Sequence, residues 1–383
     1  MIKPLMPGAT IGVLGGGQLG RMMALAARRM GYRIIVLDPS PRCPTAQVAD
    51  GVVVGALDDL EAARHLAAQV DVITLDTEHV PAEILDALHA IVPVRPGPNV
   101  LRTIQDRLTQ KQFLDGLAIP QARWAAVESA EDLAQALATL GGQGILKVRR
   151  AGYDGKGQAR IDTADDTATR HAKLAQLRGQ PAVIEEIVEF RREISVILAR
   201  GLDGSIELFP IAENQHRKHV LHLTRAPAQM SAKGAAHVGE LAVSIAQALD
   251  HVGVMAVEMF ELPDGRVMVN EIAPRTHNSG HFTYGACSTS QFEQHVRAVC
   301  GVALGSARAL SGAVMVNLLG DLWAKGPPPW QHVLNLPNAR LHLYGKDGAA
   351  PGRKMGHVVL LDDDTDRAVA DGNAMFARLV PRI

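Results

Sequence analysis

Apolar residues in the first ninety positions occur as short runs, separated by segments of helical periodicity. Four runs have the length of buried strands, at 9–14, 33–37, 52–54 and 71–75. The segments between and after them predict helices at 18–30, from 58 onward and at 81–90. Strands that alternate with helices are typical of an open parallel sheet. The pattern therefore predicts a Rossmann-like α/β unit at the N-terminal end of the chain.

A different pattern, strict alternation of apolar residues, occupies 254–272 on both sides of Asp264-Gly265. This predicts a β-hairpin, and a two-residue loop would pair Pro263 with Arg266. Glu258 would then lie opposite Glu271, with their Cβ atoms about 5 Å apart. Mg²⁺ would neutralise two carboxylates so placed. A longer loop would break this register, and a solvated edge hairpin remains the alternative.

Between these two regions lie a predicted helix at 100–117 and a strand at 144–148 that contains Lys147. Lys147 either extends along a sheet edge to solvent or points at a bound anion. The segment 152–158 has three glycines and basic flanks, and its amides could cover phosphates. It lacks the Walker A order, and a flexible hairpin tip is the alternative.

A second glycine-rich segment, Gly15 to Gly20, follows the first strand and is followed in turn by a helix, a strand and Asp38. This matches the dinucleotide fingerprint, although the phosphate of some other ligand is just as compatible, and a tight turn that binds nothing is the alternative. Glu78 follows the strand at 71–75, at the sheet edge where ligands of such sheets bind. It either faces a small molecule or lies beside a helix N-terminus.

The composition is that of a globular protein and argues against several other classes of protein. The 383 residues suffice for two or three domains, and 47% are hydrophobic. A net charge of −1 and only 4% aromatic residues argue against a nucleic-acid surface. Cys43, Cys287 and Cys300 are isolated, which argues against disulfides or a zinc site. No signal peptide or apolar run of about 18 residues is evident, so we expect a cytoplasmic protein.

Six motifs follow one another in order: GGGQLGRM, DRLTQKQ, GYDGKGQ, VMAVEMF, NEIAPRTHNSGHFT and PGRKMGH. Together they resemble the ATP-grasp superfamily and, within it, the 5-(carboxyamino)imidazole ribonucleotide synthases, ATP-dependent carboxylating enzymes of de novo purine synthesis. The resemblance extends from Ile11 to about Leu361. It implies an ATP-grasp fold of mixed α/β and α+β character. The expected parts are a Rossmann-like pre-ATP-grasp domain at 1–105, a linker helix with a small lid domain at 106–185, and a C-terminal mixed-sheet domain at 186–383.

The resemblance also implies roles for particular residues. Mg²⁺ would be held by Glu258 and Glu271. ATP would be bound by Arg107, Lys147, Gly152, Tyr153, Asp154, Gly155, Lys156, Gly157, Gln158, Glu185, Glu186, Ile187, Val188, Glu193, His216, Asn270 and Glu271. The aminoimidazole ribonucleotide would be bound by Gln18, Leu19, Glu78, Asn278, Lys346, Arg353 and Lys354. Catalytic candidates are Tyr153, Asp154, Arg275, His277 and His281.

The implied chemistry has two steps. ATP phosphorylates bicarbonate, and the exocyclic amine of the ribonucleotide then captures carboxyphosphate or the CO₂ released from it. The loop at 152–158 would exclude water. Enzymes of this type are usually homodimers, and the N-terminal domain is the expected contact. Two departures from the family pattern stand out: Ala151 replaces a usual glycine, and 217–219 is unusually basic.

Three rival interpretations remain open. A flavin or nicotinamide oxidoreductase would use the glycine-rich turn and Asp38, but would leave Glu258 and Glu271 without a role. A protein that only binds its ligand would have lost a phosphate or metal group, and none is lost. A sister ATP-grasp enzyme would act on glycinamide ribonucleotide with formate, although the segment HNSGH favours aminoimidazole.

Overall fold

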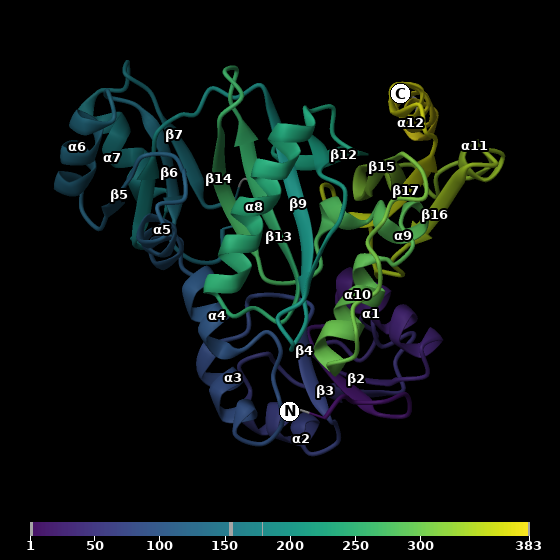
Figure 1. Cartoon of the computed structure of the whole chain (residues 1–383). Coiled ribbons are helices and arrows are strands. Elements are labelled where there is room, and N and C mark those ends of the chain that lie inside the picture. The colour runs from purple at the N-terminus through teal and green to yellow at the C-terminus, as the bar shows by residue number, and fades with distance from the viewer. Residues whose placement is uncertain (1–2, 153–155, 178, 382–383) are drawn as a thin grey trace.

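The computed structural model describes residues 3–152, 156–177 and 179–381, and within these ranges the chain forms three β-sheets (Figure 1). The N-terminal sheet is parallel, which confirms the predicted α/β unit. Its strand order is β3 (Gly51–Val54), β2 (Arg33–Asp38), β1 (Thr10–Leu14) and β4 (Val72–Leu75). Its helices are α1 (Gln18–Arg29), α2 (Leu60–Ala67) and α3 (Ala82–His89).

The predicted single helix at 100–117 is wrong, because the chain forms two helices there. These are α4 (Pro98–Ile104) and α5 (Arg107–Gly116). Asp106 begins α5 by accepting the backbone N–H of Leu108 at 2.9 Å, as N-cap residues do. The same buried carboxylate accepts Nη2 of Arg149 at 2.7 Å. The break thus ties the start of α5 to the segment that leads into the glycine-rich loop.

The small sheet is antiparallel and follows α5. Its strand order is β5 (Trp124–Val127), β8 (Ala182–Glu185), β6 (Gly144–Val148) and β7 (Gln158–Ile161). Two helices, α6 (Ala130–Thr139) and α7 (Thr167–Ala175), accompany it. Its apolar side chains form a cluster of their own, which includes Val127, Leu137 and Ile161.

The large sheet has nine strands. Eight lie in the order β14 (Val267–Ala273), β13 (Gly253–Glu261), β9 (Arg192–Arg200), β11 (Ala212–Arg217), β12 (Val220–Ala226), β15 (Ala313–Leu319), β17 (Lys354–Leu361) and β16 (Ala339–Leu343), and β10 (Ile206–Leu208) pairs with β9. We expected a mixed sheet, but every pairing between its named strands is antiparallel. The one parallel contact with these strands in the described ranges is an isolated bridge between Gln121 and Val269.

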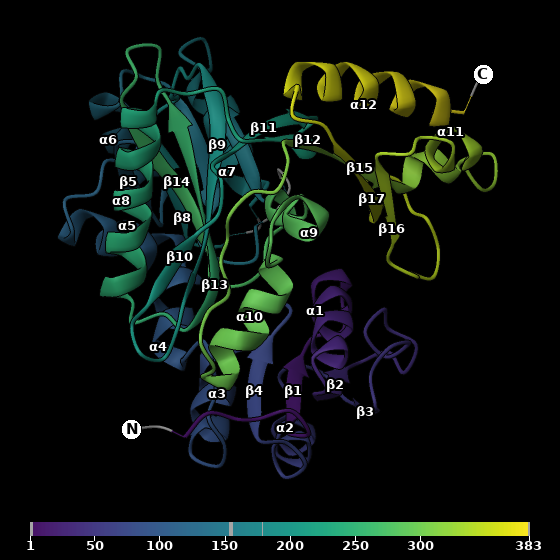
Figure 2. The same cartoon turned by 45° about the vertical axis from the view of Figure 1, so that its right-hand side comes forward.

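Helices cover both faces of the large sheet (Figure 2). One face carries α8 (Ala232–Ala248), and the other carries α9 (Thr283–Ala286) and α10 (Gln291–Cys300). The short elements η1 (Asn278–Gly280), η2 (Gly320–Trp323) and α11 (Gln331–Leu334) and the terminal α12 (Thr365–Leu379) complete the chain. None of the helices in the described ranges combines the length and apolar character needed to cross a membrane.

The N-terminal and large sheets share one hydrophobic core. A single cluster contains Leu85 of α3, Val196 of β9 and Val257 of β13, all fully buried. Across the same junction, Thr74 Oγ1 lies 2.7 Å from His295 Nε2. These two sheets therefore form one body, to which the small sheet with its separate core is attached.

Candidate active site

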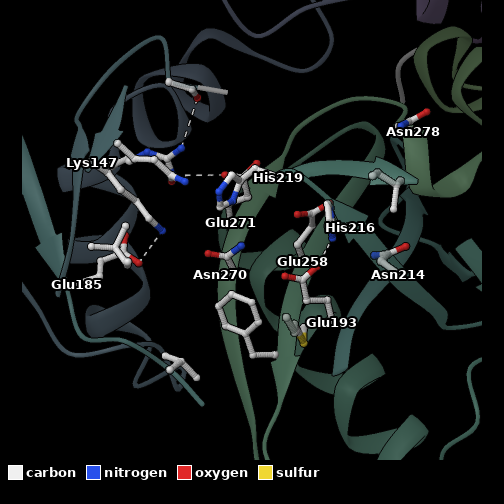
Figure 3. A pocket seen from close by; sticks show the side chains of 18 of the residues that line it. Lys147, Glu185, Glu193, Asn214, His216, His219, Glu258, Asn270, Glu271 and Asn278 are labelled. Atoms are coloured by element: carbon white, nitrogen blue, oxygen red, sulfur yellow. Dashed lines mark hydrogen bonds and ion pairs between the residues drawn. The ribbon is translucent and has the colours of Figure 1, made fainter. Parts of the chain in front are cut away.

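A cavity of about 940 Å³ is lined by residues of the small sheet, the large sheet and the end of β4 (Figure 3). It brings together most of the site residues predicted from the sequence. The predicted ATP-site residues that line it are Arg107, Lys147, Gly152, Lys156, Gln158, Glu185, Glu186, Ile187, Val188, Glu193, His216, Asn270 and Glu271. Glu78, Glu258, Arg275, His277, Asn278 and Lys354 line it as well.

Other predicted residues do not line this cavity. Leu19 is buried in the core beneath α1, and His281 is fully buried. The exposed Arg353 donates from Nη1 to the carbonyl of Gly348 at 2.8 Å, within its own turn. Gln18, Gly157 and Lys346 are also absent from the lining. The predictions for Tyr153, Asp154 and Gly155 lie outside the described residues.

The hairpin of β13 and β14 places Glu258 opposite Glu271, as predicted, but by a different route. The loop has three residues rather than two, because Leu262 and Arg266 close it and Gly265 takes a left-handed φ of 84°. That loop alone would shift the register by one. A β-bulge after Val269 inserts Asn270 and restores it. Because of the bulge, the adjacent residues Asn270 and Glu271 both line the cavity.

The charges of the paired carboxylates are only partly compensated by neighbouring cations. Burial and the charge of Glu271 raise the pKa of Glu258 to about 7, against the opposing charges of His216 and Lys354. In the described ranges, no group of three or more His, Cys, Asp or Glu side chains is arranged to hold a metal. A pair suits Mg²⁺ nevertheless, because this cation keeps waters and takes further oxygen ligands from phosphates.

Histidines flank Glu258. His216 Nδ1 forms an ion pair with Glu193 Oε2, and although burial lowers the pKa of His216, this hydrogen bond and the charges of Glu193 and Glu258 raise it overall. His277 Nε2 lies 3.5 Å from Glu258 Oε1. Burial and the charge of Arg275 lower the pKa of His277 to about 3. His277 is therefore neutral at pH 7.

The opposite wall of the cavity is basic. Arg107 Nη1 lies 3.3 Å from Glu271 Oε2, and Lys147 Nζ lies 2.9 Å from Glu185 Oε2. A second lysine, Lys111, lies 3.3 Å from Glu185 Oε1. Lys111 was not among the site residues predicted from the sequence. Its position one helical turn after Arg107 on α5 was the available signal.

Glu78 and Arg275 pair with each other across the junction of the N-terminal and large sheets. Glu78 Oε1 accepts Arg275 Nη2 at 2.8 Å, and Oε2 accepts Nε. Burial alone would raise the pKa of Glu78, but the charge and hydrogen bonds of Arg275 lower it to about 2. Glu78 was predicted to bind the ribonucleotide and Arg275 to act in catalysis, and the pairing brings both to one place in the cavity.

Comparison with known proteins agrees with this geometry. Three family models match: the ribonucleotide synthetase preATP-grasp domain at 8–105, the ATP-grasp domain at 112–292 and the phosphoribosylaminoimidazole carboxylase C-terminal domain at 313–371. The N5-carboxyaminoimidazole ribonucleotide synthase of Brucella melitensis is 48% identical over 361 residues, which cover 94% of this chain and 98% of that protein. The chain belongs to the N5-carboxyaminoimidazole ribonucleotide synthase family.

Solved structures of this synthase family have the same fold. The Staphylococcus aureus enzyme complexed with ADP has a TM-score of 0.92, 36% identity and 99% coverage of both chains. The Aspergillus clavatus enzyme in complex with ADP and 5-aminoimidazole ribonucleotide has a TM-score of 0.88 and 32% identity, and covers 97% of this chain and 98% of that one. These names give no support to the glycinamide ribonucleotide alternative.

In this synthase, the first glycine-rich turn is filled by the protein's own carboxylates. Gly16 N donates to Asp38 Oδ2 at 2.8 Å, and Gly17 N donates to Asp76 Oδ2 at 3.0 Å. A Cβ on Gly16 would overlap Cys43 Sγ, so this glycine permits close packing. Two amides that a dinucleotide phosphate would use are therefore occupied. The sequence analysis assigned no role to Asp76.

The two departures from the synthase pattern both lie at left-handed backbone positions. Ala151 has a φ of 60°, a conformation that favours glycine. Lys218 and His219 have φ values of 51° and 63° at the tip between β11 and β12, and both line the cavity. Asn-Gly is the usual sequence of such a tip.

Proposed function

We propose that this chain catalyses the ATP- and bicarbonate-dependent carboxylation of the exocyclic amine of 5-aminoimidazole ribonucleotide. The products are 5-(carboxyamino)imidazole ribonucleotide, ADP and phosphate, so the enzyme is a carbon–nitrogen ligase of de novo purine synthesis. The observation that carries the proposal is the shared cavity. A carboxylate pair, a basic wall and the Arg275-His277-Asn278 segment all meet in it.

ATP would lie between the small and large sheets. Its triphosphate would face Arg107 and Lys147, and the described part of the loop at 152–158 would cover it. Phe190 and Phe260 stack with ring centroids 4.7 Å apart, and they line the cavity together with Val188. This apolar end suits the adenine ring. Glu193 would accept the ribose hydroxyls, in place of part of its present contact with His216.

Glu258 and Glu271, with Asn270 beside them, would hold Mg²⁺. The raised pKa of Glu258 supports this assignment, because a divalent cation removes the repulsion that raises it. When bound, Mg²⁺ would neutralise charge on the phosphates during transfer.

Bicarbonate is a poor electrophile, and its oxygen would attack the γ-phosphorus of ATP to give carboxyphosphate and ADP. Arg275 supplies a buried cation for the bicarbonate anion, and Glu78 holds its guanidinium in place. The exocyclic amine would then attack the carboxyl carbon, expelling phosphate and releasing one proton. Neutral His277 has a basic nitrogen, but its low pKa makes it a poor resting base. We therefore assign His277 to orienting the intermediate, with Tyr153 and Asp154 as further candidates; His281 is fully buried and does not line the cavity.

The ribonucleotide would lie toward the N-terminal sheet. Its phosphate would be bound by the start of α1 at Gln18 and Leu19, where helix amides favour anions, and by the basic turn. The basic turn comprises Lys346, Arg353 and Lys354. Asn278, only 6% exposed and lining the cavity, would contact the imidazole; both of its side-chain amide atoms lack a hydrogen-bond partner within the described protein.

The division into domains at 1–105, 106–185 and 186–383 and a homodimer joined through the N-terminal domain remain proposals that rest on the resemblance. A cytoplasmic location remains a proposal that rests on composition.

The decisive experiment measures phosphate release from ATP with Mg²⁺ and bicarbonate, with and without aminoimidazole ribonucleotide. We expect strong stimulation by the ribonucleotide. Stimulation only by glycinamide ribonucleotide with formate would overturn the substrate assignment, and silence with both would overturn the function.

A further inference from the structure

Three histidines form a stack beneath the site. The His357 ring lies between the other two, with centroids 4.3 Å from His281 at 12° and 4.6 Å from His342 at 18°. His281 and His357 are fully buried, and burial lowers the pKa of both well below the ordinary value. Neutral rings can stack in this way without charge repulsion.

Hydrogen bonds at Nε2 do not explain why these rings are histidines rather than phenylalanines. The Nε2 atoms of all three are buried and lack a hydrogen-bond partner within the described protein. Such atoms cost stability relative to apolar rings. The hydrogen bond that holds the middle ring joins its Nδ1 to the hydroxyl of Tyr344 at 2.7 Å, and Tyr344 is also fully buried.

The stack joins the segments that would bind the ribonucleotide. His281 lies three residues after Asn278, and His357 lies three residues after Lys354 on β17. Tyr344 lies two residues before Lys346, whose Nζ is 5.7 Å from the Tyr344 ring centroid. His357 thus contacts both His281 and Tyr344, and their segments carry Asn278 and Lys346.

We infer that His357 and Tyr344 are positioning residues for the ribonucleotide: they hold the basic turn at a fixed distance from the Asn278 segment. The hydrogen bond fixes the rotation of the His357 ring, and the ring faces fix the spacing between β17 and the segment that ends at His281. The inference rests on the proposed function, because it concerns the same ribonucleotide site. Neither residue lines the cavity, so their effect is exerted through Asn278 and the basic turn.

The test is calorimetric titration of aminoimidazole ribonucleotide and, separately, of ATP with Mg²⁺ into four variants. His357→Phe keeps a ring but loses the hydrogen-bonding Nδ1, and His357→Asn keeps a hydrogen-bonding group near the Nδ1 position but loses the ring. Tyr344→Phe removes the hydroxyl. His222→Phe is the matched control, since His222 is a buried histidine of the same sheet that packs edge-to-face against Phe376.

We expect about tenfold weaker ribonucleotide binding in the first three variants, with ATP binding within about twofold of the wild type, since small displacements of positioning groups have effects of at least this size. The control should bind both ligands normally. A thermal melt identifies variants that fold normally. Normal ribonucleotide binding by a well-folded His357 variant, or equal loss of both ligands, would overturn the inference. Failure of the wild type to bind the ribonucleotide would instead overturn the proposed function, and the inference with it.

Discussion

Glu78 and Glu258 face the same cavity with nearly equal side-chain exposure, 22% and 19%, yet their pKa values move in opposite directions. The pKa of Glu78 falls to about 2 and that of Glu258 rises to about 7. Burial raises both, so burial does not separate them. The difference comes from the neighbour: Glu78 has the guanidinium of Arg275, whereas Glu258 has a second carboxylate.

This contrast separates two uses of a buried acid. In the Glu78–Arg275 pair, each charge is neutralised by the other within the protein, and the pair joins the N-terminal sheet to the large sheet. The charges of Glu258 and Glu271 are offset only in part by Arg107, His216 and Lys354, and in the proposed function a cation from outside neutralises the remainder. A carboxylate left unstable in the free protein is the stronger indication of a ligand site, because the fold alone gives no reason for it.

The largest expected effect comes from Glu271→Gln, which removes one charge of the facing carboxylate pair. We expect ribonucleotide-stimulated phosphate release to fall about 1000-fold, since metal ligation contributes several kcal/mol to the transition state. A phosphate-release assay measures this. Asp264→Asn, at the exposed tip of the same hairpin, is the control and should retain full activity. More than a tenth of wild-type activity in Glu271→Gln would contradict the metal assignment.

Breaking the Glu78–Arg275 ion pair should lower the stability of the fold. Glu78→Gln leaves Arg275, with a side chain 17% exposed, without its carboxylate. We expect the free energy of unfolding to fall by about 3 kcal/mol, measured by urea denaturation. Asp86→Asn breaks the exposed Arg102–Asp86 pair and should cost less than about 1 kcal/mol. An equal loss of unfolding free energy in Glu78→Gln and Asp86→Asn would show that the Glu78–Arg275 pair contributes no more than an exposed pair.

The two acids should also give opposite pH dependences. Glu78, with its lowered pKa, contributes stability above its unfolded value of 4.5 that is lost as pH falls toward about 2. Glu258, with its raised pKa, contributes stability that is lost as pH rises from 4.5 to about 7. Because Mg²⁺ binds the ionised pair, its affinity should rise about tenfold per pH unit below pH 7 and then level off.

Thermal melts from pH 2 to 8, with and without Mg²⁺, measure both effects. Glu258→Gln should abolish the pH dependence of the Mg²⁺ effect. An unchanged slope in that variant would show that another group titrates.

The smallest effect is expected from Lys354→Met. The charge of Lys354 lowers the pKa of Glu258, so its removal should raise that pKa further. The pKa of Glu258, measured by NMR titration without Mg²⁺, should rise by about 0.3, the size expected for a screened charge. Lys233→Met, an exposed change on α8, should have no effect. An unchanged pKa in Lys354→Met would show that Lys354 does not act on Glu258.

Local features of this chain could be read from the sequence, and features assembled from distant segments could not. The strand–helix alternation of the first ninety residues predicted the parallel sheet. The facing of Glu258 and Glu271 was predicted from a two-residue loop that does not exist, and the bulge at Asn270 compensated the error. The local spacing of residues does not indicate whether a hairpin sets its register by the length of its loop or by a bulge.

Contacts between residues far apart in the sequence could not be predicted from local patterns. Glu78 and Arg275 are 197 residues apart, and both were singled out without any sign that they pair. Asp106 looked like a helix-interior residue because the apolar periodicity continues through it. Besides its capping bond to Leu108, its carboxylate accepts Arg149 Nη2, 43 residues away, a partner that only the fold brings to it.

Because β14 contains one extra residue at the bulge, the hairpin can tolerate the deletion of one residue. Loss of one residue between Arg266 and Asn270 could be absorbed by straightening the bulge, which would keep Glu271 on the cavity side and sacrifice only the position of Asn270. Loss of a second residue could not be absorbed in this way, because no second bulge remains, and Glu271 would turn into the hydrophobic core. Tolerance of deletions in this strand should therefore end after a single residue.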